Sequence, residues 1–398
     1  MELTKKQAEG LDIAIQRFRD GEKYTVISGY AGAGKSTLVK FITEALANEG
    51  IAPDLIGYAC YTGKAAQVLI DKGIDNAVTL HKLLYKAILL PNGKYKYQPR
   101  DCLDYRVVIV DECSMAPASI IKQLASHEDV YCIFCGDPAQ LPPIVESEDN
   151  HLLDRPHIFL DEIMRQAQDS GIIRLSMLIR EGKSIKGFTS NDAKVISSSC
   201  LEDTTILNSD INLCATNNTR KDLNAYIRQL KGLQGPYPLP GDKVICLRNE
   251  WDTCSERGNA LTNGCIGTLD DIYNSCLEYP YWRYKPGVVD TLNGHFVTET
   301  GDDFGELFTD KELYRTGKPT ISDKEKYNIL KNKGAFQFRL PLEFDFAYAI
   351  TVWKAQGSQW NNVVLLEENF PRERELHTRF LYTAVTRAVK NIEVYLKN

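Results

Sequence analysis

The sequence predicts an α/β fold built on parallel β-sheets, and the alternation of two kinds of segment carries this prediction. Short apolar segments typical of strands lie at 24–28, 54–60, 106–110 and 130–135, and segments of helical periodicity lie between them at 35–48 and 63–71. Apolar strands that alternate with helices are typical of parallel sheets covered on both faces. In such sheets, ligands bind beyond the carboxyl ends of the strands, and the polar clusters of this chain follow its strand-like segments.

The same alternation returns in the C-terminal half and predicts a second αβ domain. Strands are expected at 211–215, 346–351, 363–367 and 392–396, and helices at 217–230 and 379–389.

Two segments interrupt the alternation. Residues 85–104 contain Asn92-Gly93, a turn signal that predicts a small β-hairpin. Residues 267–341 are rich in Gly, Tyr, Asp and Thr, with one charged helical piece near 322–331, which predicts a small, mostly β insertion. We therefore expect a first domain at 1–153 that carries the hairpin, and a second domain made of 154–266 and 342–398 that carries the insertion.

Composition indicates an ordinary globular protein and leaves its partner open. The chain has 398 residues, of which 43% are hydrophobic and 25% charged, and a net charge of −6. Apolar runs are shorter than the roughly 20 residues of a membrane helix, and no signal peptide is recognisable, so we expect a cytoplasmic protein without a membrane partner. The negative net charge argues only weakly against nucleic acid, because a local groove can still be basic.

Eleven cysteines, an odd number, indicate free thiols in a reducing compartment. The one CxxC, Cys132 and Cys135, lies in an apolar strand-like run and has no second pair, so we interpret both as buried strand thiols rather than as zinc ligands.

The strongest motif is Gly29-Tyr-Ala-Gly-Ala-Gly34-Lys35-Ser36, which matches the P-loop at every fixed position and lies between a strand and a helix. Its glycines allow backbone N–H groups to surround phosphates, and the following helix adds its positive end. Lys35 is expected at the β- and γ-phosphates of ATP and Ser36 on Mg²⁺. The residues expected to bind the nucleotide here are Gly29, Ala31, Gly32, Ala33, Gly34, Lys35, Ser36 and Thr37.

Two further clusters follow strands and complete the predicted ATP site. Asp111 and Glu112 end the apolar run 107–110; Asp111 is expected to hold Mg²⁺, and Glu112 to orient or deprotonate the attacking water. Gln140, in Gly136-Asp-Pro-Ala-Gln140, is expected to sense the γ-phosphate; the alternative is a loop stiffened by proline.

The order of these motifs resembles superfamily-one helicases of the 5′→3′ class, the RecD-like and phage Dda-like proteins. The resemblance covers nearly the whole chain except 267–341. The other matching motifs are Leu3-Thr-x-x-Gln7, Thr62-Gly-Lys64-Ala-Ala66, Thr79-Leu-His81, Leu160-x-x-x-x-Arg165-Gln166, Ala215-Thr-Asn217-x-x-Arg220, Asn263-Gly264-x-x-Gly267, Ala349-Ile-Thr351-x-x-Lys354-Ala-Gln356-Gly357-Ser358 and Tyr382-Thr-Ala-Val-Thr386-Arg387-Ala388.

The resemblance implies two RecA-like P-loop NTPase domains, with an SH3-like insertion, that translocate on single-stranded DNA and open duplexes. It implies that Gln7 reads adenine, that Arg165 and Arg387 reach the γ-phosphate, and that Gly357 lies at the nucleotide. It places DNA contacts at Thr62, Lys64, His81, Tyr95, Tyr97, Asn217, Thr351, Trp353, Lys354, Gln356 and Ser358. The family usually has histidine at Trp353 and glutamate at Gln359.

If Arg165 and Arg387 reach the nucleotide, ATP lies between two domains and draws them together, and hydrolysis releases them. If the two domains bind single-stranded nucleic acid alternately, this cycle moves the protein along it. We expect a monomer that acts at single-strand/double-strand junctions, with replication or repair proteins as further partners.

Three alternatives stay open: a translocase that displaces proteins without unwinding, an NTP-dependent switch that binds a protein, and RNA in place of DNA. Tyr95 and Tyr97 either separate strands as a wedge or pack against the domain body. Arg387 is otherwise a solvated helix charge.

Overall fold

The computed structural model describes residues 3–89, 95–142, 151–164, 169–282, 285–332 and 339–397. The chain divides into two compact units. The first unit comprises Met1–Leu84, Arg100–Ala215 and Thr351–Asn398, and the second comprises Tyr85–Pro99 and Thr216–Ile350. Among the described residues, no helix has both the length and the apolar character that a membrane crossing requires.

The first unit contains a six-stranded sheet in the order β3-β2-β6-β7-β1-β8, and its strands pair in parallel. Ile27, Ile109 and Ile133 from its central strands lie in one buried apolar cluster, which explains why these segments read as continuous apolar runs. The strands are β1 (Tyr24–Gly29), β2 (Ile56–Cys60), β3 (Ala77–Thr79), β6 (Val107–Asp111), β7 (Tyr131–Gly136) and β8 (Ile158–Leu160).

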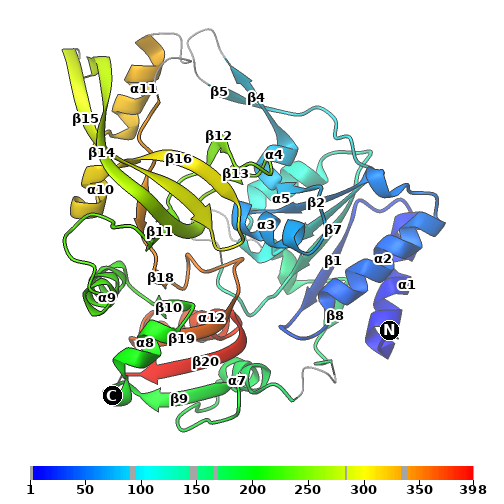
Figure 1. Ribbon diagram of the computed structural model, residues 1–398. Coiled ribbons are helices and arrows are strands. Elements are labelled where there is room, and N and C mark those ends of the chain that lie inside the picture. Colours follow the sequence, from blue (N-terminus) through cyan, green and yellow to red (C-terminus); the bar gives the residue numbers. More distant parts are fainter. Residues whose placement is uncertain are drawn as a thin grey trace. The chain divides into compact units, whose positions relative to one another are not determined.

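Helices connect these strands as the parallel order requires. They are α1 (Lys5–Arg19), α2 (Lys35–Asn48), α3 (Gly63–Asp71), α4 (Leu80–Leu84) and α5 (Ala118–Ala125), with short 3-10 turns at η1 (Pro53–Leu55), η2 (Cys113–Met115) and η3 (His151–Asp154). Helices α1 and α2, in blue in Figure 1, lie side by side against β1 and β8. Helix α1 begins at a capping box in which Thr4 accepts from the Gln7 amide and the Gln7 side chain accepts from the Thr4 amide.

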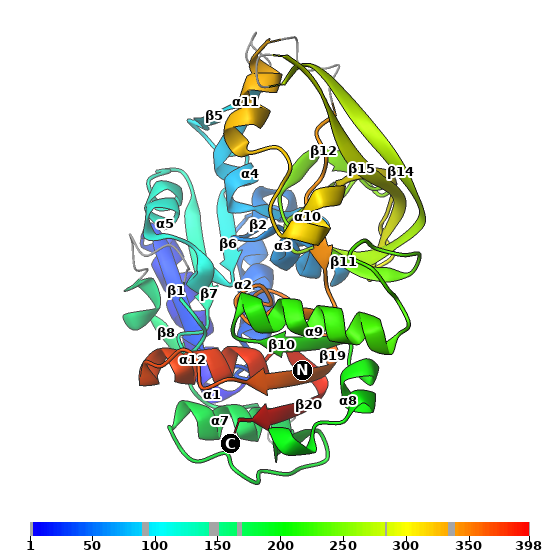
Figure 2. The ribbon, with the colours of Figure 1, turned by 90° about the vertical axis from the view of Figure 1, so that its left-hand side faces the viewer.

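A second sheet has the order β18-β10-β19-β20-β9, and the boundary between the units falls within β18. Its strands are β9 (Ala193–Ser197), β10 (Ile211–Cys214), β18 (Ala349–Thr351), β19 (Trp360–Glu367) and β20 (Ala388–Leu396). In the first unit it is accompanied by α7 (Gly171–Arg180), η4 (Ser198–Cys200), α8 (Asp203–Asn208) and α12 (Arg374–Val385). Figure 2 shows α12 and α7 close to β20, and the two helices pack against each other.

The second unit is built on an antiparallel sheet in the order β16-β15-β14-β11-β17. Its core contains Leu269, Phe296 and Phe344. Its elements are α9 (Asn217–Leu230), β11 (Asp242–Cys246), β12 (Glu250–Cys254), β13 (Ala260–Leu261), β14 (Ile266–Trp282), β15 (Lys285–Thr298), β16 (Asp303–Asp310), α10 (Lys311–Thr316), α11 (Asp323–Asn332) and β17 (Phe344–Phe346). β4 (Tyr85–Leu89) and β5 (Tyr95–Pro99) form an antiparallel hairpin; the predicted turn at Asn92-Gly93 lies outside the described residues.

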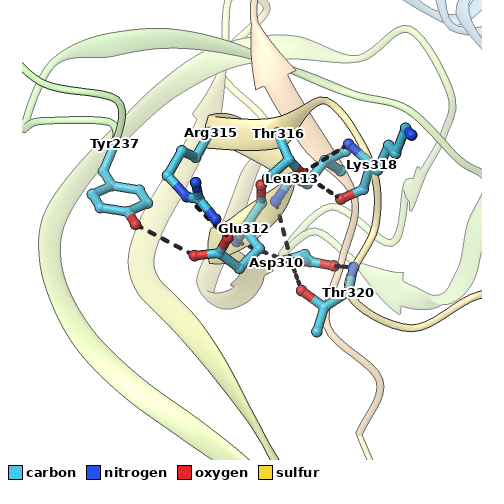
Figure 3. Close-up of polar contacts among 8 residues, drawn as sticks. All are labelled: Tyr237, Asp310, Glu312, Leu313, Arg315, Thr316, Lys318 and Thr320. Atoms are coloured by element: carbon cyan, nitrogen blue, oxygen red, sulfur yellow. Dashed lines mark hydrogen bonds and ion pairs between the residues drawn. The ribbon is translucent and has the colours of Figure 1, made fainter.

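Asp310 organises the end of β16 and the start of α10, as Figure 3 shows. One of its carboxylate oxygens accepts from the amides of Glu312 and Leu313, at 3.2 and 3.3 Å, which caps the helix. The same oxygen accepts from the Thr320 hydroxyl and the other accepts from the Thr320 amide, both at 2.6 Å. One buried carboxylate therefore joins a strand, a helix and the loop that follows the helix.

The structure confirms the predicted helices Lys35–Asn48, Gly63–Asp71 and Asn217–Leu230. The buried positions of Cys132 and Cys135 on β7 are also as predicted. The prediction of one strand at 346–351 is wrong, because β17 and β18 belong to different sheets. The helix predicted at 379–389 instead spans Arg374–Val385, because residues from Ala388 onward pair with β19. The domain limits at 153, 267 and 341 stay predictions; strands from outside 267–341 join the antiparallel sheet.

Candidate functional site

The P-loop follows β1 and leads into α2 at the carboxyl edge of the first sheet. Gly34 precedes α2 with φ of 78°, and within the described ranges no side chain caps this helix, an arrangement that suits anion binding by its first N–H groups. A Cβ atom at Gly34 would lie 2.4 Å from Gln7 Nε2, which explains the glycine. Lys35 Nζ donates to the carbonyls of Gly29 and Tyr30 at 2.7 and 3.1 Å.

The acidic pair lies at the end of β6 on the same edge of the sheet. Asp111 Oδ1 accepts from the Glu112 amide at 2.9 Å, and Glu112 has a left-handed φ of 51°. Burial and the adjacent Glu112 carboxylate raise the pKa of Asp111, and the Lys35 charge opposes this shift. Of the two predicted magnesium ligands, Ser36 lies in the first turn of α2, after the loop that follows β1, and Asp111 ends β6, so both lie at the same edge of the sheet.

The loop after β7 brings a buried amide to this edge. Gln140 is 6% exposed, and its Oε1 atom has no hydrogen-bond partner in the part of the chain that the structure describes. A buried acceptor without a partner fits a site that is completed by a ligand or a water molecule. The donor set of this edge, with Lys35, Ser36, the acidic pair and Gln140, therefore fits a magnesium–nucleotide complex.

Gln7 is buried and has both ends of its amide engaged. Nε2 donates to the Gly34 carbonyl at 3.1 Å and Oε1 accepts from the Thr4 amide at 3.0 Å. The side chain thus supports the P-loop, and adenine recognition by Gln7 stays a prediction.

Arg387 lies just beyond α12 and is 2% exposed, so it is not a solvated helix charge. Its guanidinium donates to the carbonyls of Thr383 and Ser358, at 3.0 and 3.2 Å, and to the Thr386 hydroxyl at 3.2 Å. To contact a phosphate, the guanidinium would have to leave these bonds. The predicted roles of Arg387 and Arg165 at the γ-phosphate stay predictions, and Arg165 lies outside the described residues.

A helix and a loop that flank the second sheet contact the loops of the predicted ATP site. Leu141, after Gln140, donates from its amide to Thr383 Oγ1 and accepts at its carbonyl from Gln356 Nε2, both at 2.9 Å. Gly357 has φ of 74°, and a Cβ atom there would lie 3.2 Å from Thr62 Oγ1. Gln356 and Ser358 are buried, at 5% and 3% exposed, so these two predicted DNA contacts face the protein interior.

Other predicted DNA contacts of the first unit follow strand ends. Thr62 caps α3, with its hydroxyl accepting from the Ala65 amide, and Lys64 lies in the first turn of this helix. His81 lies on α4 with its ring 5.8 Å from that of Tyr61. Trp353, two residues beyond Thr351 and next to Lys354, packs 5.3 Å from the Phe380 ring and 6.3 Å from the Phe370 ring.

The remaining predicted contacts belong to the second unit. Asn217 is the first residue of α9, and its side chain accepts from Arg220 Nε at 3.2 Å. Tyr95 and Tyr97 lie on β5, opposite Leu89 and Ala87.

Among the residues that touch the P-loop, Tyr382 and Arg180 had no role assigned from the sequence. Tyr382 belongs to a quoted motif but had no assigned role, and its hydroxyl accepts from the Ala31 amide at 2.8 Å. Arg180, at the end of α7, places its guanidinium carbon 3.5 Å from the centre of the Tyr30 ring. Helical periodicity could not have found Arg180, because only the packing of the second sheet brings it to the P-loop.

The fold and this site have the features of a P-loop NTPase, and helices α7 and α12, which lie beside a second sheet, contact the predicted nucleotide-binding loops. Residues 2–196 match a family model described as an AAA domain, and residues 346–394 match a UvrD-like helicase C-terminal domain. Over these segments the chain is similar to superfamily-one helicases such as RecD2 and Dda.

Two curated relatives illustrate this similarity. The ATP-dependent RecD2 DNA helicase of Deinococcus radiodurans is 26% identical over 97% of this chain and 48% of its own length. The ATP-dependent DNA helicase Dda of phage T4 is 27% identical over 48% of either chain. The matches thus span about half the length of these relatives.

Solved structures of the same fold include Pif1 helicase from Candida albicans, with a TM-score of 0.55 and 19% identity over 100% of this chain and 95% of that one. Pif1 from Bacteroides bound to single-stranded DNA has a TM-score of 0.54 and 17% identity over 99% and 92% of the two chains.

Proposed function

We propose that this protein is an ATP-dependent DNA helicase that moves 5′→3′ along single-stranded DNA and separates duplexes. The contact of α7 and α12, the helices beside the second sheet, with the P-loop carries the proposal, since a motor needs a second element that responds to the bound nucleotide. Its relatives RecD2 and Dda are named as ATP-dependent DNA helicases. The direction rests on the likeness to 5′→3′ families.

The nucleotide would be held by the P-loop amides and Lys35, and Mg²⁺ by Ser36 and Asp111. The metal would supply positive charge at the phosphate oxygens. Glu112 would orient the attacking water. Gln140 would sense the γ-phosphate through its Oε1 atom, which has no hydrogen-bond partner among the described residues.

Single-stranded DNA would be held at the carboxyl edges of the two sheets. Thr62 and Lys64 at the start of α3 present a hydroxyl and an ammonium group, which suit phosphate oxygens. Thr351 at the end of β18 and Lys354 beyond it present the same pair of groups. Trp353 would offer an aromatic face to a base. Action as a monomer in the cytoplasm, at single-strand/double-strand junctions and beside replication or repair proteins, belongs to the same proposal.

ATP turnover measured with and without single-stranded DNA, followed by unwinding of duplexes with a 5′ or a 3′ tail, tests this function. We expect DNA to stimulate turnover at least about tenfold and only the 5′-tailed duplex to open. ATP turnover that DNA does not stimulate would favour the protein-binding switch. The same measurements with RNA show whether DNA or RNA is the substrate.

The second candidate is a translocase that displaces proteins without unwinding, and the hairpin β4–β5 separates it from a helicase. Replacement of Tyr95 and Tyr97 by Ala should abolish unwinding and retain DNA-stimulated ATP turnover if the hairpin is the wedge. Unchanged unwinding would remove that role.

A further inference from the structure

A tyrosine of α12, the helix beside the second sheet, connects two loops of the predicted nucleotide site. The hydroxyl of Tyr382, on α12, accepts from the Ala31 amide at 2.8 Å and donates to Asp137 Oδ2 at 2.7 Å. Tyr382 is 1% exposed and Asp137 is 2% exposed. Because both partners are buried, neither can exchange this hydroxyl for bulk water without a structural change.

Asp137 uses its other carboxylate oxygen to shape its own loop. Oδ1 accepts from the Ala139 amide at 2.9 Å, and the Gln140 amide donates to the Asp137 carbonyl at 3.3 Å. At the far end of the loop, Leu141 is bonded to Thr383. Two neighbouring residues of α12 therefore hold both ends of the loop that carries Gln140.

The P-loop is gripped at two successive residues. Arg180 covers the ring of Tyr30, and Tyr382 is bonded to Ala31. The helices that carry these two side chains, α7 and α12, pack against each other. A displacement of Tyr30 and Ala31 should therefore shift both packed helices, α7 and α12, and not only one side chain.

We propose that Tyr382 is a positioning residue that transmits the nucleotide state of the P-loop and of the Gln140 loop to α12 and the second sheet. P-loop amides are the groups that donate to phosphate oxygens, and the Ala31 amide of this loop is bonded to Tyr382. A shift of Ala31 or of Asp137 moves the shared hydroxyl, and the rigid phenol ring moves α12 with it. The transmission requires nucleotide binding at the P-loop, which is part of the proposed function, but not DNA.

Hydrogen exchange of the full chain with and without magnesium and a non-hydrolysable ATP analogue tests this transmission. We expect the analogue to change exchange in the peptide covering 374–387 of the unmodified protein. Tyr382→Phe keeps the ring and removes the hydroxyl, so most of that change should disappear. Tyr395→Phe is the matched control, because it also removes a phenol hydrogen bond of a buried tyrosine, to Glu393 Oε2 at 2.7 Å on β20, away from both loops.

A second readout is the ratio of single-stranded DNA affinities with and without the analogue. Couplings between sites are typically about 5- to 150-fold, and we expect the ratio to fall at least about fivefold in Tyr382→Phe and to stay constant in Tyr395→Phe. A hydroxyl that merely stabilises the fold would lower the melting temperature in both variants and leave the ratio unchanged.

The proposal is overturned if Tyr382→Phe retains the full exchange response, or if the unmodified protein shows no response in 374–387. If Tyr382→Phe does not fold, Asp137→Asn tests the same bridge with a neutral acceptor and should reduce the response in part; a full response would again overturn it. A protein that shows the exchange response but binds no DNA would refute the helicase function and leave the role of Tyr382 intact.

Discussion

Lys35 is the residue on which the nucleotide site depends most directly. Its ammonium bonds to the Gly29 and Tyr30 carbonyls and is the P-loop charge placed to meet phosphates. Lys35→Ala should lower kcat/KM for ATP by at least about 100-fold, because preorganised charges at phosphates supply much of the catalysis. Lys40→Ala, on an exposed position of the same helix, should retain turnover. Equal turnover in both variants would remove Lys35 from the site.

Glu112 is expected to act on hydrolysis and not on binding. Its left-handed backbone places it beyond Asp111, which is expected to hold the metal. Glu112→Gln should bind ATP with an affinity within about threefold of the parent protein and lose at least about 100-fold in kcat. Nucleotide titration and single-turnover hydrolysis measure the two effects separately, and normal hydrolysis would exclude Glu112 as the catalytic carboxylate.

His157, which is bonded to the strand before the P-loop, should make the stability of the fold depend on pH. Its Nδ1 accepts from the Val26 amide at 2.9 Å, which requires a neutral ring. Burial, assisted by the Arg17 charge, lowers the pKa of His157 below its ordinary value of 6.5. The unfolded chain then binds a proton more readily than the folded one, so stability should fall as pH decreases below about 6.5. Chemical denaturation between pH 8 and pH 5 measures this, and His157→Gln should reduce the slope; an unchanged slope would contradict the assignment.

At the scale of elements, Asp310 connects β16, α10 and the loop after α10 in the second unit (Figure 3). Asp310→Ala removes the acceptor of both α10 amides and of Thr320. The free energy of unfolding should decrease by about 2–3 kcal/mol, the sum of a lost cap and of buried donors left unpaired. Asp270→Ala, at an exposed position of β14, should change it by less than about 0.5 kcal/mol. Equal losses of stability in the two variants would show that the Asp310 hydrogen bonds do not stabilise the second unit.

Elements with strong local signals are those that the sequence predicts well. Helix α2 was predictable to its last residue because the P-loop glycines fix its start and its apolar periodicity is regular. The strands within residues 346–351 were not predictable. Phe346 pairs with Val244 in the antiparallel sheet, whereas the next strand, β18, joins another sheet, and the pattern of one apolar run cannot reveal this change. Likewise, α12 stops before Arg387 because the Trp360 amide donates to the Arg387 carbonyl and strand pairing begins.

At the scale of the whole molecule, the motifs predicted which loops form the site but not how the second sheet holds them. Arg387 was the expected link to the nucleotide, since an arginine is the usual partner of a phosphate. The structure instead engages Arg387 with Thr383, Ser358 and Thr386 and brings Tyr382 to the P-loop. Both residues lie on one motif, and only tertiary packing decides which of them faces the first sheet.

The loop containing Gly357 offers a test of how closely the two sheets must approach. Its φ of 74° is left-handed, and an added Cβ would lie 3.1 Å from Ala65 Cβ and 3.2 Å from Thr62 Oγ1, at the start of α3. Gly357→Ala should therefore strain the backbone and also press the second sheet away from the predicted DNA contact Thr62. We expect DNA stimulation of ATP turnover to fall by about tenfold.

Gly187→Ala is the matched control for backbone strain, because Gly187 has φ of 73° and a Cβ atom added there would have no described atom within 4 Å. Both substitutions carry the roughly 1 kcal/mol cost of a left-handed alanine, so their melting temperatures should fall alike from this source. Only Gly357→Ala also separates the motifs of the two sheets. If the two variants lose DNA stimulation equally, strain alone explains the effect, and close approach at Gly357 does not couple nucleotide and DNA.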